Sequence, residues 1–309
     1  MSPEPRPKPL VLVTGATGYM ASQLLPELRE RYRLRLVDIK PGKDNEDVHV
    51  ADLSTEDRSA FAGLFDDVNM VIHLGYRHSA AGSNYDNSVP HIDKFEIEFG
   101  NIRMSQNVYR CAHDAGVQRV IVASSNHAAD WYEHALVHKG LKDVVTPYEL
   151  PLADNFYGWS KACYEHLGFL YASGALGRSL EVVQVRIGAP REIDASTYAP
   201  DEPPAPQPGP DFPTGLPRYK RDLGAWLSER DARQLFVRCI ETEDIRNEHG
   251  IPWQVIYGIS NNTRAFWSLI SAREVFGYQP QDDSEVRYAD DVRRLLTGGP
   301  ATLSGRVGS

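Results

Sequence analysis

The chain of 309 residues has only three cysteines, an odd number at wide spacing. They provide neither a disulfide framework nor a zinc pattern, and we expect them to be small buried thiols in a reducing cytoplasm. The ten histidines are scattered as well. His134 and His138 are four residues apart, but they lack the glutamate and the third ligand of a metal-binding helix. No metal site is predicted.

Long apolar runs are also missing. No segment approaches the roughly 18 apolar residues of a membrane span, and residues 1–8 are polar and proline-rich, without the apolar centre of a targeting segment. The net charge is −9, from 33 Lys+Arg against 42 Asp+Glu, which argues against nucleic acids and anionic membranes as partners. We expect a cytoplasmic protein; an anionic small molecule would need only one or two placed cations.

The first half of the chain alternates between strand and helix patterns. Continuous apolar runs that end at glycine or polar residues are typical of strands buried on both faces. We expect strands at residues 10–14, 34–39, 70–74, 120–123 and 180–187, and helices at residues 20–32, 95–115 and 156–171. This order predicts an α/β fold, a doubly wound parallel sheet of Rossmann type, in which ligands bind beyond the carboxyl ends of the strands.

The second half is less regular. Eight prolines lie between Pro200 and Pro217, a density that excludes helix and central strand, so we expect an extended loop there. We divide the chain into a nucleotide-binding Rossmann domain, residues 1–190, and a smaller substrate-binding part, residues 191–296, with some segments returning to the first domain. Residues 297–309 are predicted to be a disordered tail.

A glycine-rich turn follows the first expected strand and leads into a helix. Gly15 and Gly18 permit a tight turn and let the backbone approach a pyrophosphate at the helix N-terminus. Asp38 closes the next strand, 20 residues after Gly18, where a carboxylate can accept both ribose hydroxyls and would repel a 2′-phosphate. These features predict a dinucleotide site for NAD, while Lys40 keeps NADP open. Asp52 follows a third short strand; contact with adenine and a plain surface turn are equally good interpretations.

A tyrosine and a lysine open a later helix. Tyr157 and Lys161 are four residues apart and therefore share one helix face. A free tyrosine has a pKa of about 10, so proton transfer near neutrality needs a stabilised phenolate, which an adjacent ammonium and an oxidised nicotinamide would provide. Ser124 and Ser125 follow a strand and can orient a substrate oxygen. Together these motifs predict an NAD-linked redox enzyme with Tyr157 as base and Ser125 on the reacting oxygen; Ser124 replaces it if the register slips by one.

These motifs, together with His73-Leu74-Gly75, Asn101 and Glu165, resemble an extended short-chain dehydrogenase/reductase over most of residues 9–190. The resemblance implies a homodimer, a structural role for Asn101, and helix packing for Glu165. The NAD-binding residues that follow from the motifs and the resemblance are Gly15, Thr17, Gly18, Tyr19, Met20, Asp38, Ile39, Asp52, Leu53, Leu74, Gly75, Asn101, Tyr157 and Lys161.

Two branches of that family differ after the expected strand at residues 180–187. Nucleotide-sugar epimerases and dehydratases usually carry an asparagine and a Tyr-Gly pair there, but this chain has Arg186-Ile-Gly-Ala-Pro190. Ala123-Ser-Ser-Asn-His127 and Arg221-x-Leu-x-x-Trp226 instead resemble uronate dehydrogenases. The resemblance gives Arg221 the sugar carboxylate, an assignment that matches the bidentate guanidinium fork. Further substrate-binding residues follow by the same resemblance: Ser125, Asn126, His127, Ser79 and Phe266.

Each of these substrate assignments has a plainer alternative. Arg221 could form an ion pair within its basic cluster, His127 could be a hydrogen-bonded loop histidine, and the neighbours Phe266 and Trp267 could be core residues. Three segments are also longer than we expect of uronate dehydrogenases: residues 77–94, 128–150 and 191–217. They would reshape the substrate pocket, close it, or build a subunit contact.

We therefore expect NAD-dependent oxidation of the anomeric hydroxyl of a hexuronate, glucuronate or galacturonate, to its lactone. Three alternatives stay open: a dehydrogenase of another acidic or phosphorylated aldose, a nucleotide-sugar 4-epimerase or dehydratase, and an NAD-binding sensor without catalysis. The Ser125, Tyr157 and Lys161 set argues against the sensor, which has no need of a proton relay.

Overall fold

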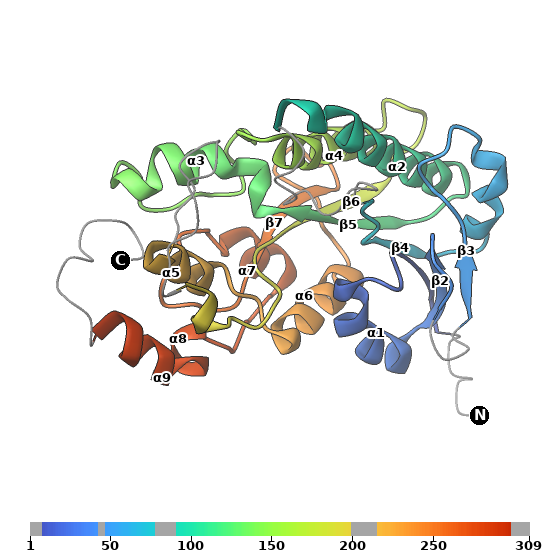
Figure 1. Cartoon of the computed structure of the whole chain (residues 1–309). Helices are drawn as coiled ribbons and strands as arrows, with labels where there is room; N and C mark the ends of the chain where they lie inside the picture. Colours follow the sequence, from blue (N-terminus) through green and yellow to red (C-terminus); the bar gives the residue numbers. More distant parts are fainter. Residues whose placement is uncertain (1–7, 43–46, 78–90, 199–214, 298–309) are drawn as a thin grey trace.

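A computed structural model describes residues 8–42, 47–77, 91–198 and 215–297 (Figure 1). Seven strands form one parallel sheet in the order β3-β2-β1-β4-β5-β6-β7. Their bounds are β1 Leu10–Thr14, β2 Arg33–Asp38, β3 Val48–Val50, β4 Met70–His73, β5 Arg119–Ser125, β6 Glu181–Ile187 and β7 Trp253–Gly258. The predicted doubly wound Rossmann fold is confirmed, and the expected strands match within one or two residues.

Helices cover both faces of this sheet (Figure 1). They are α1 Tyr19–Arg31, α2 Phe95–Asp114, α3 Asp130–Ala135, α4 Phe156–Ala172, α5 Gly215–Ala225, α6 Glu229–Glu241, α7 Ile270–Phe276, α8 Ser284–Arg287 and α9 Ala289–Val292. Short 3₁₀ helices span Arg58–Ala60, Ala62–Phe65, His91–Lys94, Asn126–Ala129, Val137–Lys139 and Ala195–Tyr198, and a π-helical turn spans Arg293–Thr297.

The two faces of the sheet have separate cores. In β1, Val11 and Val13 pack on the side of α1 and α6, whereas Leu10 and Leu12 pack on the side of α2 and α4. Successive strand residues point to opposite faces, and both faces are covered. For this reason the strand has a continuous apolar run instead of alternating polar and apolar residues.

The C-terminal part is divided between the sheet and a smaller cluster. β7 pairs with β6, and α6 packs against α1, where Nε of Arg233 donates to the carbonyl of Gln23 at 2.7 Å. Tyr219 and Leu223 of α5 pack with Ile193 in a third core beside the sheet. The domain boundary at residue 190 stays a prediction.

One sequence expectation for this part is wrong. The proline-rich loop was expected to reach Pro217, but α5 already begins at Gly215. Proline fits there because the first turn of a helix has no use for its missing N–H. Residues 200–214 of that loop and most of the predicted tail, residues 298–309, lie outside the described residues; Thr297 ends the π-helical turn.

The described residues contain neither a membrane-spanning helix nor a metal-binding cluster of side chains. None of the helices there is long and apolar enough to span a bilayer. The same ranges hold no cluster of three or more His, Cys, Asp or Glu side chains that could bind a metal ion. Cys111 and Cys239 are buried free thiols, and Cys163 is a half-buried one.

Candidate active site

The glycine turn between β1 and α1 is shaped for close backbone approach. Gly15 has a φ of +69°, and a Cβ atom there would lie 2.7 Å from the backbone nitrogen of Gly75. Gly18 is the N-cap residue of α1 and makes no side-chain cap to the amides of the first helical turn. A 13-residue helix therefore begins with backbone donors and a positive dipole end, which suits a pyrophosphate.

Asp38 lies at the carboxyl end of β2, beside that turn. Its Oδ2 accepts from the amide of Thr17 at 3.0 Å, and its Oδ1 accepts from the amide of Lys40 at 3.0 Å. A carboxylate has about four acceptor positions, so two stay available for ribose hydroxyls. Tyr19 is 56% exposed and Ile39 is exposed at the same edge. This arrangement fits the adenosine half of NAD.

Asp52 forms a turn at the end of β3. Its Oδ1 accepts from the backbone amide and the hydroxyl of Ser54, at 2.9 and 2.6 Å, and its Oδ2 lies 3.3 Å from Nη1 of Arg77. Asp52 therefore forms the turn that was one of its two interpretations from the sequence. Leu53 is buried, with its carbonyl bound by Asn107. Contact of Asp52 and Leu53 with adenine stays a prediction.

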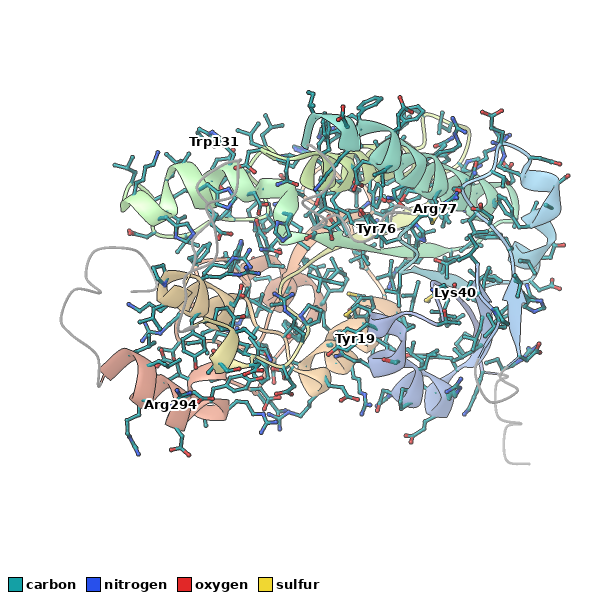
Figure 2. All side chains as sticks on the ribbon, in the orientation of Figure 1. Tyr19, Lys40, Tyr76, Arg77, Trp131 and Arg294 are labelled. Carbon is teal, nitrogen blue, oxygen red and sulfur yellow. The ribbon has the colours of Figure 1, made fainter. Side chains whose placement is uncertain are left out.

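The segment after β4 is held in place by α2. The side-chain oxygen of Asn101 accepts from the backbone amide of Arg77 at 2.8 Å. The side-chain nitrogen of Asn101 donates to the backbone carbonyls of Arg77 at 3.1 Å and Ile97 at 3.3 Å. Asn101 therefore positions the backbone that follows Leu74 and Gly75. Figure 2 shows Lys40, Tyr76 and Arg77 between α1 and α2 in this view, with Tyr19 at α1.

Glycine also controls how closely α4 approaches the end of β5. A Cβ on Gly158 would lie 2.1 Å from the carbonyl oxygen of His127, so only glycine allows this contact. Asn155 caps the helix by accepting from the Gly158 amide at 2.8 Å. As a result the ring of Tyr157 packs edge-on against the His127 ring, with centroids 5.5 Å apart.

Lys161 lies under the rings that surround Tyr157. Its ammonium is buried, donates to the carbonyl of Ala123 at 2.9 Å, and lies 5.6 Å from the centre of the Tyr157 ring. Burial lowers the pKa of Lys161 to about 8, and the carboxylate of Glu98 opposes that shift. The structure thus brings together the tyrosine and the lysine that the spacing placed on one helix face.

Sequence reasoning missed two neighbours of this pair, Tyr76 and Glu98. The Tyr76 ring packs edge-on against Tyr157 at 5.4 Å, and its hydroxyl donates to Oε1 of Glu98 at 2.5 Å. Oε2 of Glu98 accepts from the hydroxyl of Ser160 at 2.7 Å. Burial raises the pKa of Glu98, although the hydrogen bond from Tyr76 acts against the shift. The available signal was the position of Glu98, three residues before Asn101 on the buried face of α2.

The two serines at the end of β5 face different partners. The Ser124 hydroxyl donates to Oε1 of Glu165 at 2.9 Å, and Glu165 also accepts two hydrogen bonds from Arg186, at 2.8 and 2.7 Å. Oγ of Ser125 accepts from the amide of His127 at 3.2 Å. Ser124 is thus bonded to a buried ion pair, and Ser125 is the serine to which we assign the substrate oxygen. Its catalytic role stays a prediction.

His127 has a carboxylate partner. Its Nδ1 lies 2.5 Å from Oδ2 of Asp130, which is buried and also accepts from Nδ2 of Asn155 at 3.0 Å. The imidazole is therefore positioned by α3 and by the cap of α4. This geometry agrees with the alternative that His127 is a hydrogen-bonded loop histidine. Contact of His127 with the sugar stays a prediction.

Arg221 reaches from α5 to the end of β5 and is held by the chain's own carboxylates. Its Nε and Nη2 donate to the two carboxylate oxygens of Glu133 at 2.8 and 3.1 Å, and Nη1 donates to Oδ1 of Asp222 at 3.1 Å. Its guanidinium lies 5.2 Å from the centre of the Trp267 ring. Arg221 thus forms an ion pair, as the plainer alternative stated, but its main partner is Glu133, 88 positions away in sequence.

The remaining predicted substrate residues are less informative. Phe266 is 2% exposed and stacks on Trp267 with centroids 3.8 Å apart, as expected of core aromatics. Ser79 lies outside the described residues. The side-chain amide of Asn126 is assigned the orientation in which its nitrogen and its oxygen both form hydrogen bonds. The nitrogen then donates to the carbonyl of Ile187 at 3.0 Å, and the oxygen accepts from Nη2 of Arg221 at 2.6 Å.

The glycine turn, the acidic residue after β2 and the Tyr-Lys pair on α4 define a Rossmann-fold, dinucleotide-dependent protein of the extended short-chain dehydrogenase/reductase type. The sequence model of the NAD dependent epimerase/dehydratase family matches residues 11–186. The chain belongs to this family, and its cofactor is NAD.

Several known proteins are similar over nearly the whole chain. A Haloferax volcanii NAD-dependent glucose-6-phosphate dehydrogenase is 32% identical, over 89% of this chain and 94% of its own. A Pseudomonas syringae pv. tomato uronate dehydrogenase is 28% identical, over 96% and 94%. A Haloferax volcanii L-arabinose 1-dehydrogenase is 27% identical, over 89% and 97%. Among solved structures, a mutated uronate dehydrogenase covers 96% of this chain and 90% of its own, with a TM-score of 0.68 at 24% identity, and so shares the fold.

Proposed function

We propose that this chain, an NAD-dependent dehydrogenase acting on a CH–OH group of a sugar, oxidises the anomeric hydroxyl of a cyclic aldose to the lactone. The observation that carries the proposal is the contact of Tyr157 with three groups at once. Its ring packs against His127 and Tyr76 and lies over the ammonium of Lys161, beside the end of β5. A cyclic sugar with C1 at this point would present its hydroxyl to both Tyr157 and Ser125.

Each residue then has a defined task. The Tyr157 phenolate takes the proton of the C1 hydroxyl, and Ser125 donates a hydrogen bond to the same oxygen as the C1–O bond becomes a carbonyl. The Lys161 ammonium stabilises the phenolate by its charge. NAD, held by the Gly15–Gly18 turn and Asp38, would supply the hydride acceptor for C1, so that the sugar would lose a hydride, with its two electrons, and the hydroxyl proton would leave through Tyr157.

The substrate within this class is the finer question. The sequence predicts a hexuronate, and the uronate dehydrogenase among the relatives supports that choice. The relatives named for glucose 6-phosphate and for L-arabinose support a phosphorylated and an uncharged aldose in the same way. The predicted homodimer and the predicted cytoplasmic location stay predictions.

Initial rates of NADH formation test the proposal. The panel pairs NAD and NADP with glucuronate, galacturonate, glucose, L-arabinose and glucose 6-phosphate. Turnover of at least one aldose with NAD is expected, and Tyr157→Phe should lower kcat by about 10²- to 10⁴-fold while NAD still binds. An epimerase would convert its substrate without net NADH, and a sensor would bind NAD with no turnover; either result contradicts the proposal.

A further inference from the structure

We infer that Glu133 fills the anion-binding fork of Arg221 with a carboxylate of the chain's own, and that the sugar substrate carries no carboxylate or phosphate at that point. Glu133 is thereby a specificity-determining residue that selects an uncharged aldose. The inference rests on the proposed aldose oxidation for its substrate class, but the state of the fork can be measured without turnover.

The fork lies close to the reacting centre. Arg221 contacts Asn126, which directly follows Ser125 at the carboxyl end of β5. The next residue, His127, packs against Tyr157 with ring centroids 5.5 Å apart. A guanidinium in this position is the group that would bind an acidic substituent of a bound sugar, because it offers two parallel donors to a carboxylate or phosphate.

Four of the five donors of Arg221 are already used within the chain. A guanidinium has five N–H groups. Two donate to Glu133, one donates to Asp222, and a further Nη2 bond of 2.6 Å goes to the amide oxygen of Asn126. The Arg221 side chain is only 12% exposed. An incoming carboxylate would therefore have to displace Glu133 before it could form a bidentate pair.

Glu133 is itself fixed as an anion. Its side chain is 2% exposed, and its Oε1 lies 3.0 Å from Nε2 of His138. Burial opposes the charge, but the Arg221 guanidinium and the hydrogen bond from His138 outweigh it and lower the pKa of Glu133 below its usual value. Displacing this carboxylate would leave a buried charge without its strongest partner, which is strongly unfavourable.

The charges around the fork disfavour a further anion. Glu133 and Asp222 both bind Arg221, and Asp130 acts on it electrostatically. Two further cations, Arg191 and Arg218, approach Asp222 only at 3.6 and 3.7 Å and are about half exposed, and His134 acts electrostatically on Glu133. A sugar carboxylate here would be an additional negative charge facing a guanidinium that is already neutralised, whereas hydroxyl groups carry no such penalty.

The test compares the full-length wild-type chain with Glu133→Ala, both loaded with NADH, which cannot oxidise the sugar, for the binding measurement and supplied with NAD for the rates. Isothermal calorimetry measures glucuronate binding, and initial rates compare glucuronate with glucose and L-arabinose. In the wild type we expect kcat/KM for an uncharged aldose to exceed that for glucuronate by at least about 100-fold. In Glu133→Ala, glucuronate should bind at least about tenfold more tightly, because the fork is open. If the wild type favours glucuronate, or Glu133→Ala gains no glucuronate binding, the inference is wrong.

Two further variants show whether the gain passes through Arg221. Glu133→Ala combined with Arg221→Met should lose the gained glucuronate binding. Glu149→Gln is the control: it removes a carboxylate from the same 128–150 segment, where Glu149 pairs with Lys142. It should change neither the binding of glucuronate nor kcat/KM for the uncharged aldose. If Glu133→Ala fails to fold, Glu133→Gln takes its place with the same expected direction. Absence of turnover on every sugar would contradict the proposed function alone, since glucuronate binding still decides the state of the fork.

Discussion

The ammonium of Lys161 donates a 2.9 Å hydrogen bond to the backbone carbonyl of Ala123, two residues before Ser125. The strand that carries the serines therefore also fixes the lysine under the Tyr157 ring. The serines and the lysine are therefore both positioned by the end of β5. The electrostatics around them include Glu98, which lies on α2 and has no place in the sequence motifs.

The first prediction concerns the alkaline side of the pH–rate profile. The pKa of Lys161 is lowered to about 8 by burial, while Glu98 raises it. The ammonium is lost as the pH rises through that value, and with it the stabilisation of the phenolate, so kcat/KM should fall above about pH 8. Glu98→Gln removes the opposing charge, lowers the pKa of Lys161 further, and moves this fall to lower pH.

Tyr76, Ser160 and Asn101 also face Glu98. The oxygen of a glutamine can still accept from Tyr76 and its nitrogen can donate to the Ser160 hydroxyl, whereas the bond from the Asn101 amide nitrogen is lost. Glu96→Gln, an exposed change on the same helix, is the matched control and should leave the profile where it is. An unchanged alkaline limb in Glu98→Gln would mean that Glu98 does not act on Lys161.

The second prediction concerns the choice of cofactor. Asp38 accepts from the amides of Thr17 and Lys40 and offers its remaining acceptor positions to a ribose. In Asp38→Asn, one oxygen becomes a donor and the negative charge is lost. Hydrogen bonds to a charged group contribute about 1.5–3 kcal/mol, so kcat/KM for NAD should fall by about 10- to 100-fold. The ratio of NADP to NAD activity should rise; a constant ratio would remove Asp38 from the ribose site.

The third prediction concerns the buried ion pair beneath the serines. Glu165 accepts two hydrogen bonds from Arg186 and one from Ser124, and both charged side chains are about 1% exposed. Glu165→Ala leaves a buried guanidinium without its carboxylate, which typically costs about 3–5 kcal/mol. Urea unfolding should show this loss. Replacing both partners, Glu165→Met with Arg186→Met, should cost much less, and equal losses in the two variants would contradict the argument.

The fourth prediction concerns stability below neutral pH. Burial lowers the pKa of His73 to about 3 in the folded chain, and the charge of Lys161 acts in the same direction. The unfolded chain has a value near 6.5. Between pH 7 and pH 5 only the unfolded state takes up this proton, so stability should fall by about 2 kcal/mol from this group. Urea unfolding of His73→Asn should show a shallower pH dependence over that range; the same slope in both proteins would disprove it.

The nucleotide-binding half of the fold is predictable from the sequence alone. The turn at Gly15, the acidic end of β2 at Asp38 and the spacing of Tyr157 and Lys161 are local patterns, and each was found where it was predicted. These patterns can be recognised in the sequence because each depends on neighbouring residues. They are a positive φ at a glycine, the apolar run of a strand buried on both faces, and the helical repeat that places residues four apart on one side.

The surroundings of the site depend on contacts between segments that are distant in sequence. Glu98 approaches Tyr76 and Ser160 from α2, and Glu133 approaches Arg221 from a segment 88 residues away in sequence. Neither glutamate belongs to a motif, and a charged residue in a helix is exposed far more often than buried. Their roles come from the packing of α2, α3 and α5 around the ends of the strands. Which charges meet there, and which are neutralised, depends on long-range contacts that local sequence patterns do not encode.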